Sequence, residues 1–177
     1  VIGDVTVVGS LTVAAGTEVI FDPLHDTQAS GNDRSRCELI VQGGSLVVDG
    51  TSGAPVKFTS GNGNKQPNDW YGLRVLEGDV TLRHCVVEYA QEGIRFEDTD
   101  TRFNNYSLED STVQRCGGNG LYTASGQYAA VTLTNFKVWT NSTGLQANGP
   151  VTLVGGQVVG NTGYGINGGT LTATGTL

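Results

Sequence analysis

Side chains that could bind a ligand recur at one position of a repeated phrase. Each follows a Gly-Leu or Gly-Ile pair, and the five glycines, from Gly72 to Gly165, lie 21, 27, 24 and 21 residues apart. Side chains alternate between the two faces of a strand, so a residue that follows a buried Leu or Ile points outward. The expected outward column, with Lys57 placed at its start, is Lys57, Arg74, Arg95, Tyr122, Gln146 and Asn167.

This column changes from cationic to aromatic to amide side chains, which is a set suited to sugars. Pyranose rings stack on flat aromatic rings, while neighbouring polar groups bond the sugar hydroxyls. Two further tryptophans and a tyrosine are expected outside or at strand edges. The predicted ligand-binding residues are Trp70, Tyr71, Arg74, Arg95, Tyr122, Gln146, Asn167 and Trp139. Trp139 belongs to a different strand, which makes its surroundings a competing site.

Acid–base catalysis is not predicted for this column. It requires groups within hydrogen-bond reach of one another, and only Glu97 and Asp98 are acids near Arg74 and Arg95 in the repeat. These arginines are expected to pair with neighbouring acids in solvent. We therefore predict no catalytic residue and a chain that is not an enzyme, with a polysaccharide lyase or hydrolase as the alternative.

Two acid-rich segments offer hard oxygen ligands for calcium. They are 97–100 and the group of Asp22, Asp26 and Asp33, and neither has the spacing of a known calcium loop. A solvated loop is the competing interpretation of both. We predict no cofactor and no metal ligands, and keep Ca²⁺ as the alternative.

The repeat predicts three short strands per coil. The first strands include Val80-Thr81-Leu82 and Val131-Thr132-Leu133, and a residue type that tolerates a left-handed backbone follows each one: His84, Asp110, Asn135 or Gly155. The second strands bury Val87, Val113, Val138 and Val158, and the third strands carry the glycine phrase. A looser version of the pattern extends to the N-terminus, for about seven coils in all.

Three polar insertions interrupt the repeat at 22–36, 59–69 and 97–105. We expect all three to follow the same third strand and to line one edge, because insertions in stacked repeats cluster on one face. Ligand is expected on the third-strand face between the second and third insertions.

Composition excludes some functions. With 10 Lys+Arg, 17 Asp+Glu and a net charge of −7, the chain lacks the basic patch that nucleic acids need. Neither an apolar helical stripe nor a stretch long enough to span a membrane is present. The three cysteines are odd in number and show no CxxC spacing, so buried free thiols are predicted.

The chain resembles the right-handed parallel β-helix superfamily, whose members are pectate-lyase-like. The best local matches are Asp69-Trp70-Tyr71-Gly72-Leu73-Arg74-Val75 and Gly50-Thr51-Ser52-Gly53-Ala54-Pro55-Val56-Lys57-Phe58-Thr59-Ser60. The resemblance implies an all-β solenoid but not one function, because this scaffold hosts lyases, hydrolases, adhesins and binding modules.

Within that superfamily the chain is most similar to small β-helical carbohydrate-binding modules of xylan-degrading enzymes. The resemblance implies a non-catalytic module for plant cell-wall polysaccharide, with xylan as first choice. We expect 1–177 to form one domain, a monomer excised from a longer secreted or cell-surface protein and appended to a catalytic domain. An adhesin or structural spacer is a further alternative.

Overall fold

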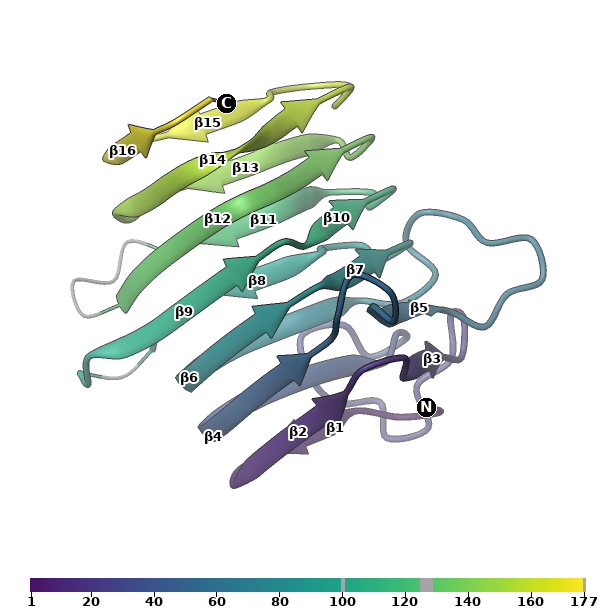
Figure 1. The fold of residues 1–177 in the computed structure, drawn as a ribbon. Helices are drawn as coiled ribbons and strands as arrows, with labels where there is room; N and C mark the ends of the chain where they lie inside the picture. The colour runs from purple at the N-terminus through teal and green to yellow at the C-terminus, as the bar shows by residue number, and fades with distance from the viewer. Residues whose placement is uncertain (100, 125–128, 177) are drawn as a thin grey trace.

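The structure is a computed structural model that describes residues 1–99, 101–124 and 129–176. It consists of strands joined by bends and loops, and the described residues contain no helix. Each coil contributes a strand to each of three parallel sheets, and the coils stack along one axis (Figure 1). Several strands run continuously through a bend and so belong to two sheets.

We name the three sheets after the predicted strand positions. The third-strand sheet comprises β1 (Val5–Val7), the first parts of β4 (Glu38–Asp49) and β6 (Gly72–Arg83), β8 (Ile94–Phe96), β11 (Asn119–Thr123), β13 (Thr143–Ala147) and β15 (Ile166–Gly168). The first-strand sheet comprises β2 (Ser10–Ala14), the last parts of β4 and β6, β9 (Asn104–Glu109), the first parts of β12 (Ala129–Trp139) and β14 (Val151–Val159), and β16 (Leu171–Thr174). The second-strand sheet comprises β3 (Glu18–Phe21), β5 (Val56–Ser60), β7 (Cys85–Glu88), β10 (Thr112–Gln114) and the last parts of β12 and β14.

The register of these strands agrees with the repeat. In the third-strand sheet each of these residues pairs with the next one in the series: Leu73, Ile94, Leu121, Leu145 and Ile166. The first four are at most 2% exposed, whereas Ile166, in the last coil that the structure describes, is 36% exposed. The predicted parallel β-helix solenoid of about seven coils is confirmed.

Left-handed residues turn the chain between sheets. His84, Asp110 and Asn135 have φ of 44°, 49° and 46° at the predicted first bend, and Gly155 takes the same place in the next coil. The second bend is centred on Tyr89, Arg115, Thr140 and Gly160, which also have positive φ. A single left-handed residue turns the chain from one sheet into the next while its N–H still bonds to the next coil, as His84 does to the Glu109 carbonyl.

Inward side chains of all three sheets fill the core. The four inward phenylalanines (Phe21, Phe58, Phe96 and Phe136) are each at most 2% exposed. The three cysteines are buried free thiols, also as predicted. Burial raises the pKa of Cys85 to about 11 and that of Cys116 to about 12, which keeps both thiols protonated and unreactive.

The insertions do not share one edge, so this prediction was wrong. Segments 22–36 and 59–69 follow β3 and β5 of the second-strand sheet, while 97–105 follows β8 of the third-strand sheet. The first two therefore lie before a third strand and the last lies after one. As a result, 22–36 and 59–69 lie where third strands begin, and 97–105 lies where a third strand ends.

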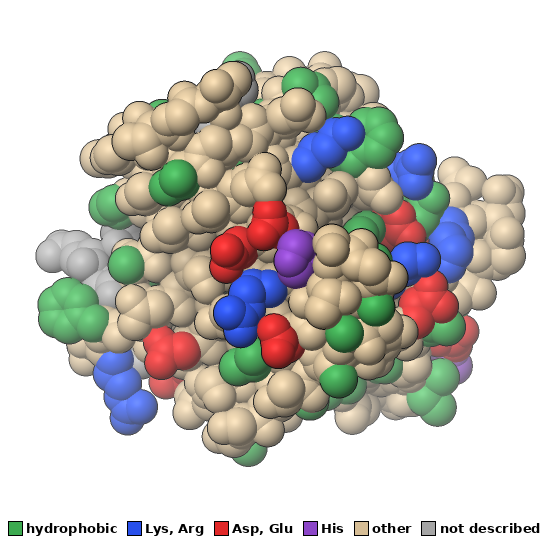
Figure 2. Space-filling model, in the orientation of Figure 1, with side chains coloured by type: hydrophobic (Ala, Val, Ile, Leu, Met, Phe, Trp, Pro, Cys, Tyr) green, Lys and Arg blue, Asp and Glu red, His purple; other side chains and the backbone are tan. Residues whose placement is uncertain are grey.

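Charged groups of opposite sign lie together on the surface. On the face drawn in Figure 2, acidic, basic and histidine side chains meet near the middle. At the ends of the first strands and in the bend that follows, Arg83 lies 3.2 Å from Asp49 and His84 lies 3.9 Å from Asp110. Within the described residues, no helix is long and apolar enough to pass through a bilayer.

Candidate functional site

Five of the predicted residues lie in one outward column of the third-strand sheet, at the back in Figure 1. Arg74, Arg95, Tyr122, Gln146 and Asn167 pair successively in parallel register. Neighbouring strands are about 4.8 Å apart, so the column presents one side chain per coil at that spacing. From Arg74 to Asn167, the side chains therefore form one outward column, as the repeat predicts.

Lys57 does not belong to this column. It lies in β5 of the second-strand sheet, where it pairs with Val86 and contacts Glu18 at 3.7 Å. The place before Arg74 is taken by Ile40, which is buried. Val56-Lys57-Phe58 alternates as a third strand would, but it follows a first-strand bend directly.

Three glutamates surround the two arginines of the column. Glu97 accepts two hydrogen bonds from Arg74, from Nε at 2.9 Å and from Nη2 at 3.0 Å, and a third from Arg95 Nε at 3.1 Å. Glu92 lies 3.5 Å from Arg95, and Glu38 lies 3.7 Å from Arg74. The predicted pairing with acids is confirmed, but the arginines are not freely solvated, because their side chains are only 17% and 22% exposed.

The carboxylates of this network differ in their surroundings. Burial would raise the pKa of Glu97, but the hydrogen bonds and charges of Arg74 and Arg95 outweigh it and hold that pKa below its ordinary value. Burial raises the pKa of Glu38 above its ordinary value, although backbone N–H groups of Asn32 and Asp33 and the charge of Arg74 oppose the shift. Glu97 is thus held ionised, while ionisation of Glu38 is disfavoured.

The repeat pattern overlooked Glu38 and Glu92. Glu38 pairs with Gly72, so it occupies the place that glycine holds in the later coils. Glu38-Leu39-Ile40-Val41 in place of a Gly-Leu phrase was the signal that could have identified it. Glu92 directly precedes Gly93, and its carboxylate accepts a hydrogen bond from Asn119 Nδ2 at 2.9 Å.

The rest of the column is uncharged, and its two amide side chains are hydrogen-bonded to each other. The guanidinium carbon of Arg95 lies 4.1 Å from the centroid of the Tyr122 ring and covers one of its faces. Asn167 donates to Gln146 at 2.8 Å, and Gln146 donates to Asn148 at the same distance. A ligand would therefore meet a half-buried tyrosine, with one ring face already covered, beside a chain of amides.

Trp70 and Tyr71 do not contribute to this surface, contrary to prediction. Trp70 is fully buried, stacks on Phe21 with centroids 4.0 Å apart, and donates from Nε1 to the Glu88 carbonyl at 2.9 Å. Tyr71 is 3% exposed, and its hydroxyl accepts a hydrogen bond from Asn32 of the first insertion at 2.7 Å. Burial raises the pKa of Tyr71 to about 12. The repeat places both rings at a strand edge, but it does not show which side chains the insertions cover.

Trp139 lies outside the column, in the second-strand sheet beside Gln114. Lys137 Nζ is 4.3 Å from its ring centroid, and the guanidinium carbon of Arg115 is 5.7 Å away. Its indole Nε1 is buried without a hydrogen-bond partner among the described residues. This competing surface is separate from the column, since the two belong to different sheets.

The acids proposed as calcium ligands bind their own loops. Asp22 contacts His25 at 2.7 Å, Asp26 accepts the N–H groups of Gln28 and Ser30, and Asp33 accepts from Ser35 and Arg36. Asp100 of the second acid-rich segment lies outside the described residues. Where the chain is described, no group of three or more His, Cys, Asp or Glu side chains could hold a metal ion.

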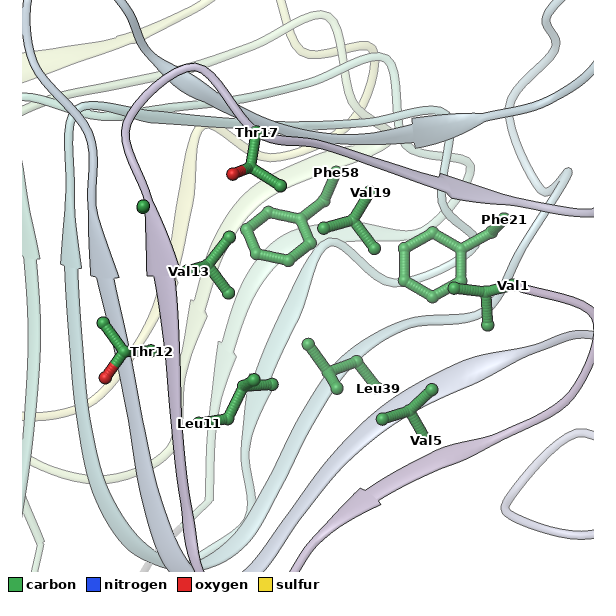
Figure 3. A pocket seen from close by; sticks show the side chains of 11 residues that line it. Val1, Val5, Leu11, Thr12, Val13, Thr17, Val19, Phe21, Leu39 and Phe58 are labelled. Carbon is green, nitrogen blue, oxygen red and sulfur yellow. The ribbon is translucent and has the colours of Figure 1, made fainter.

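A hollow of about 470 Å³ lies at the N-terminal end of the rod. Apolar side chains from the first two coils point into it, among them Leu11, Val19, Phe21, Leu39 and Phe58 (Figure 3). These are inward core positions, and the hollow is the open end of the core. It does not bring polar groups together, so it is not the candidate site.

Comparison with known families places the fold. Residues 4–84 match the family model of the pectate-lyase like beta helix domain. The match covers the coils that contain Glu38 and Arg74, and the parallel sheets continue beyond it to β16. The fold is a parallel β-helix, and its matched residues are similar to that family. This β-helix match supports a polysaccharide-related protein, while searches of curated proteins and of solved structures found no match.

Proposed function

We propose that the β-helix is a non-catalytic carbohydrate-binding module that recognises a plant cell-wall polysaccharide, with xylan as first choice. The observation that carries the proposal is the in-register column of Tyr122, Gln146 and Asn167. A linear polymer repeats its hydroxyl groups at a regular spacing, and this column repeats hydrogen-bonding groups at about 4.8 Å.

The charge of the column favours a neutral polymer. Arg74 and Arg95 are both engaged by Glu97, and Glu92 and Glu38 lie within 4 Å of one or the other. Two guanidinium groups therefore face three carboxyl groups, one of them with a raised pKa. The family name refers to pectate, a polyanion, yet this face offers no surplus of positive charge to attract one.

A polysaccharide lyase or hydrolase is the second candidate. Glu38 and Glu97 contact the same arginine and have pKa values shifted in opposite directions, which is the arrangement expected of a general acid with a partner base. However, Glu38 is 0% exposed and bonded to the backbone of the first insertion, so no substrate can reach it in this conformation. The pair is better explained as a clamp between the insertion and the sheet.

Affinity electrophoresis against soluble polysaccharides tests the proposal. We expect gels that contain xylan to retard the chain. Gln146→Ala and Asn167→Ala should each weaken retardation about threefold to tenfold, because one hydrogen bond of about 0.5–1.5 kcal/mol is lost. Thr132→Ala, an outward change in the first-strand sheet, is the matched control and should bind as the unchanged chain does.

Other outcomes select the alternatives. Loss of binding with Trp139→Ala alone would move the site to the second-strand sheet. Accumulation of reducing or unsaturated sugar ends in a long incubation would identify an enzyme, and Glu97→Gln should then abolish it. If no polysaccharide retards the chain, an adhesin or spacer becomes the better proposal. A module of this kind is proposed to act outside the cell, secreted or on the cell surface, as a monomer attached to a catalytic domain.

A further inference from the structure

Glu97 holds a distinctive position in the candidate site. Its carboxylate bonds Arg74 of the coil below and Arg95 of its own coil, with three hydrogen bonds of 2.9 to 3.1 Å. The three side chains are between 16% and 22% exposed, so water screens their charges less than it would at an open surface. Charge-assisted bonds of this kind are among the stronger ones in proteins.

The other two glutamates cannot replace it. Glu92 lies near Arg95 only, at 3.5 Å, and shares its carboxylate with Asn119. Glu38 lies near Arg74 only, at 3.7 Å, and its other oxygen is occupied by N–H groups of Asn32 and Asp33. Among the described residues, Glu97 is the one acid that contacts both arginines.

We propose that Glu97 sets the ligand class of the third-strand face: by occupying Arg74 and Arg95, it favours neutral polysaccharides and disfavours polyuronates. This inference rests on the proposed function, since it assumes that sugars bind this face. Specificity is a difference between two affinities, and withholding a positive charge lowers the affinity for the anionic ligand while leaving the neutral one unaffected. Arginine binds carboxylates with two parallel hydrogen bonds, so an arginine freed from Glu97 would be a ready partner for a uronate.

Glu97→Gln tests the inference, with xylan and polygalacturonate as the two probes. The amide keeps the shape of the side chain but removes the charge that holds both arginines. We expect the variant to bind polygalacturonate at least about tenfold more tightly than the unchanged chain at low salt, and the gain to vanish at high salt. Binding to xylan should change by less than about threefold, within one ordinary hydrogen bond. Glu97→Asp, which keeps the carboxylate, should restore most of the preference for xylan.

Glu109→Gln is the matched control. It makes the same change in net charge, but Glu109 is exposed in the first-strand sheet. Circular dichroism before and after heating checks that each variant is folded. The inference is overturned if Glu97→Gln gains no more affinity for polygalacturonate than Glu109→Gln does, or if the unchanged chain already prefers polygalacturonate.

Failure of the proposed function would look different. If the unchanged chain binds neither probe, the binding-module proposal fails. The gain of Glu97→Gln on polygalacturonate is still measured in that case and still decides the inference.

Discussion

Replacing Trp70 separates a core role from a ligand-binding role. Trp70 stacks on Phe21, with centroids 4.0 Å apart and planes inclined by 3°, and donates a hydrogen bond to the Glu88 carbonyl. Trp70→Ala removes a fully buried ring and should cost about 3–5 kcal/mol of unfolding free energy. Trp70→Phe keeps a ring against Phe21 but leaves the Glu88 carbonyl without its donor, which should cost about 1–3 kcal/mol.

Trp139→Phe provides the control, because the chain has only two tryptophans. The Trp139 indole N–H has no partner among the described residues, so its removal forfeits no hydrogen bond. We expect a cost below about 1 kcal/mol, which makes the difference between the two Trp→Phe changes a measure of the Trp70 bond. Urea unfolding followed by far-ultraviolet circular dichroism is the assay, since it does not depend on tryptophan fluorescence.

If Trp70 is a core residue, its replacement should lower the free energy of unfolding but leave ligand binding unchanged. At urea concentrations where Trp70→Phe is folded, its retardation by polysaccharide should equal that of the unchanged chain. The reasoning would be refuted by a Trp70→Ala variant that loses less than about 1 kcal/mol while it abolishes binding, because that result belongs to an exposed ring.

Three other predictions test register, bends and charge. Leu121→Ala should cost about 2–5 kcal/mol and Tyr122→Ala less than about 1 kcal/mol in urea unfolding, since one side chain is buried and its neighbour points outward; the reverse order would contradict the register. His84→Gly should leave stability nearly unchanged and His84→Val should cost about 1–2 kcal/mol, because φ is 44° at this bend and only glycine adopts it without strain; equal costs would contradict this account. Since the pKa of Glu97 is lowered on folding, its stabilising effect is present above its ordinary pKa of 4.5 and is lost as the pH falls through the folded value; the stability difference between the unchanged chain and Glu97→Gln should therefore shrink on acidification, and a difference that grows would contradict the ion pairs.

The architecture was predictable because a stacked repeat states each structural requirement several times. The glycine phrase recurs in five coils, and each recurrence supports the same inward and outward assignment. The bend at His84, Asp110 and Asn135 could be predicted even though the three residues differ, because all three types tolerate φ near +45°. Both features depend on residues that are close in sequence, and the period then aligns the coils.

Prediction failed at and beside the insertions. Their residues do not follow the repeat, so they cannot be aligned with the other coils. The 22–36 loop folds back over Tyr71, and Asn32 within it bonds the tyrosine hydroxyl across 39 residues of sequence. A residue at a strand edge is exposed or buried according to such a loop, whose path the repeat does not determine. The same loop supplies the N–H groups that hold Glu38, which explains why Tyr71 was misplaced and Glu38 was overlooked.

The candidate site lies between these two cases. Its column could be predicted, since Arg74, Arg95 and Tyr122 are set by the glycine phrase alone. The pairing of its arginines with acids could also be predicted, but their burial and the part played by Glu38 could not, because Arg74 meets one glutamate in the coil before it and another in the coil after it. An arginine without an acidic partner would offer a positive charge to a ligand. Here glutamates of the two neighbouring coils pair with Arg74, so the groups left for a ligand are hydroxyls and amides.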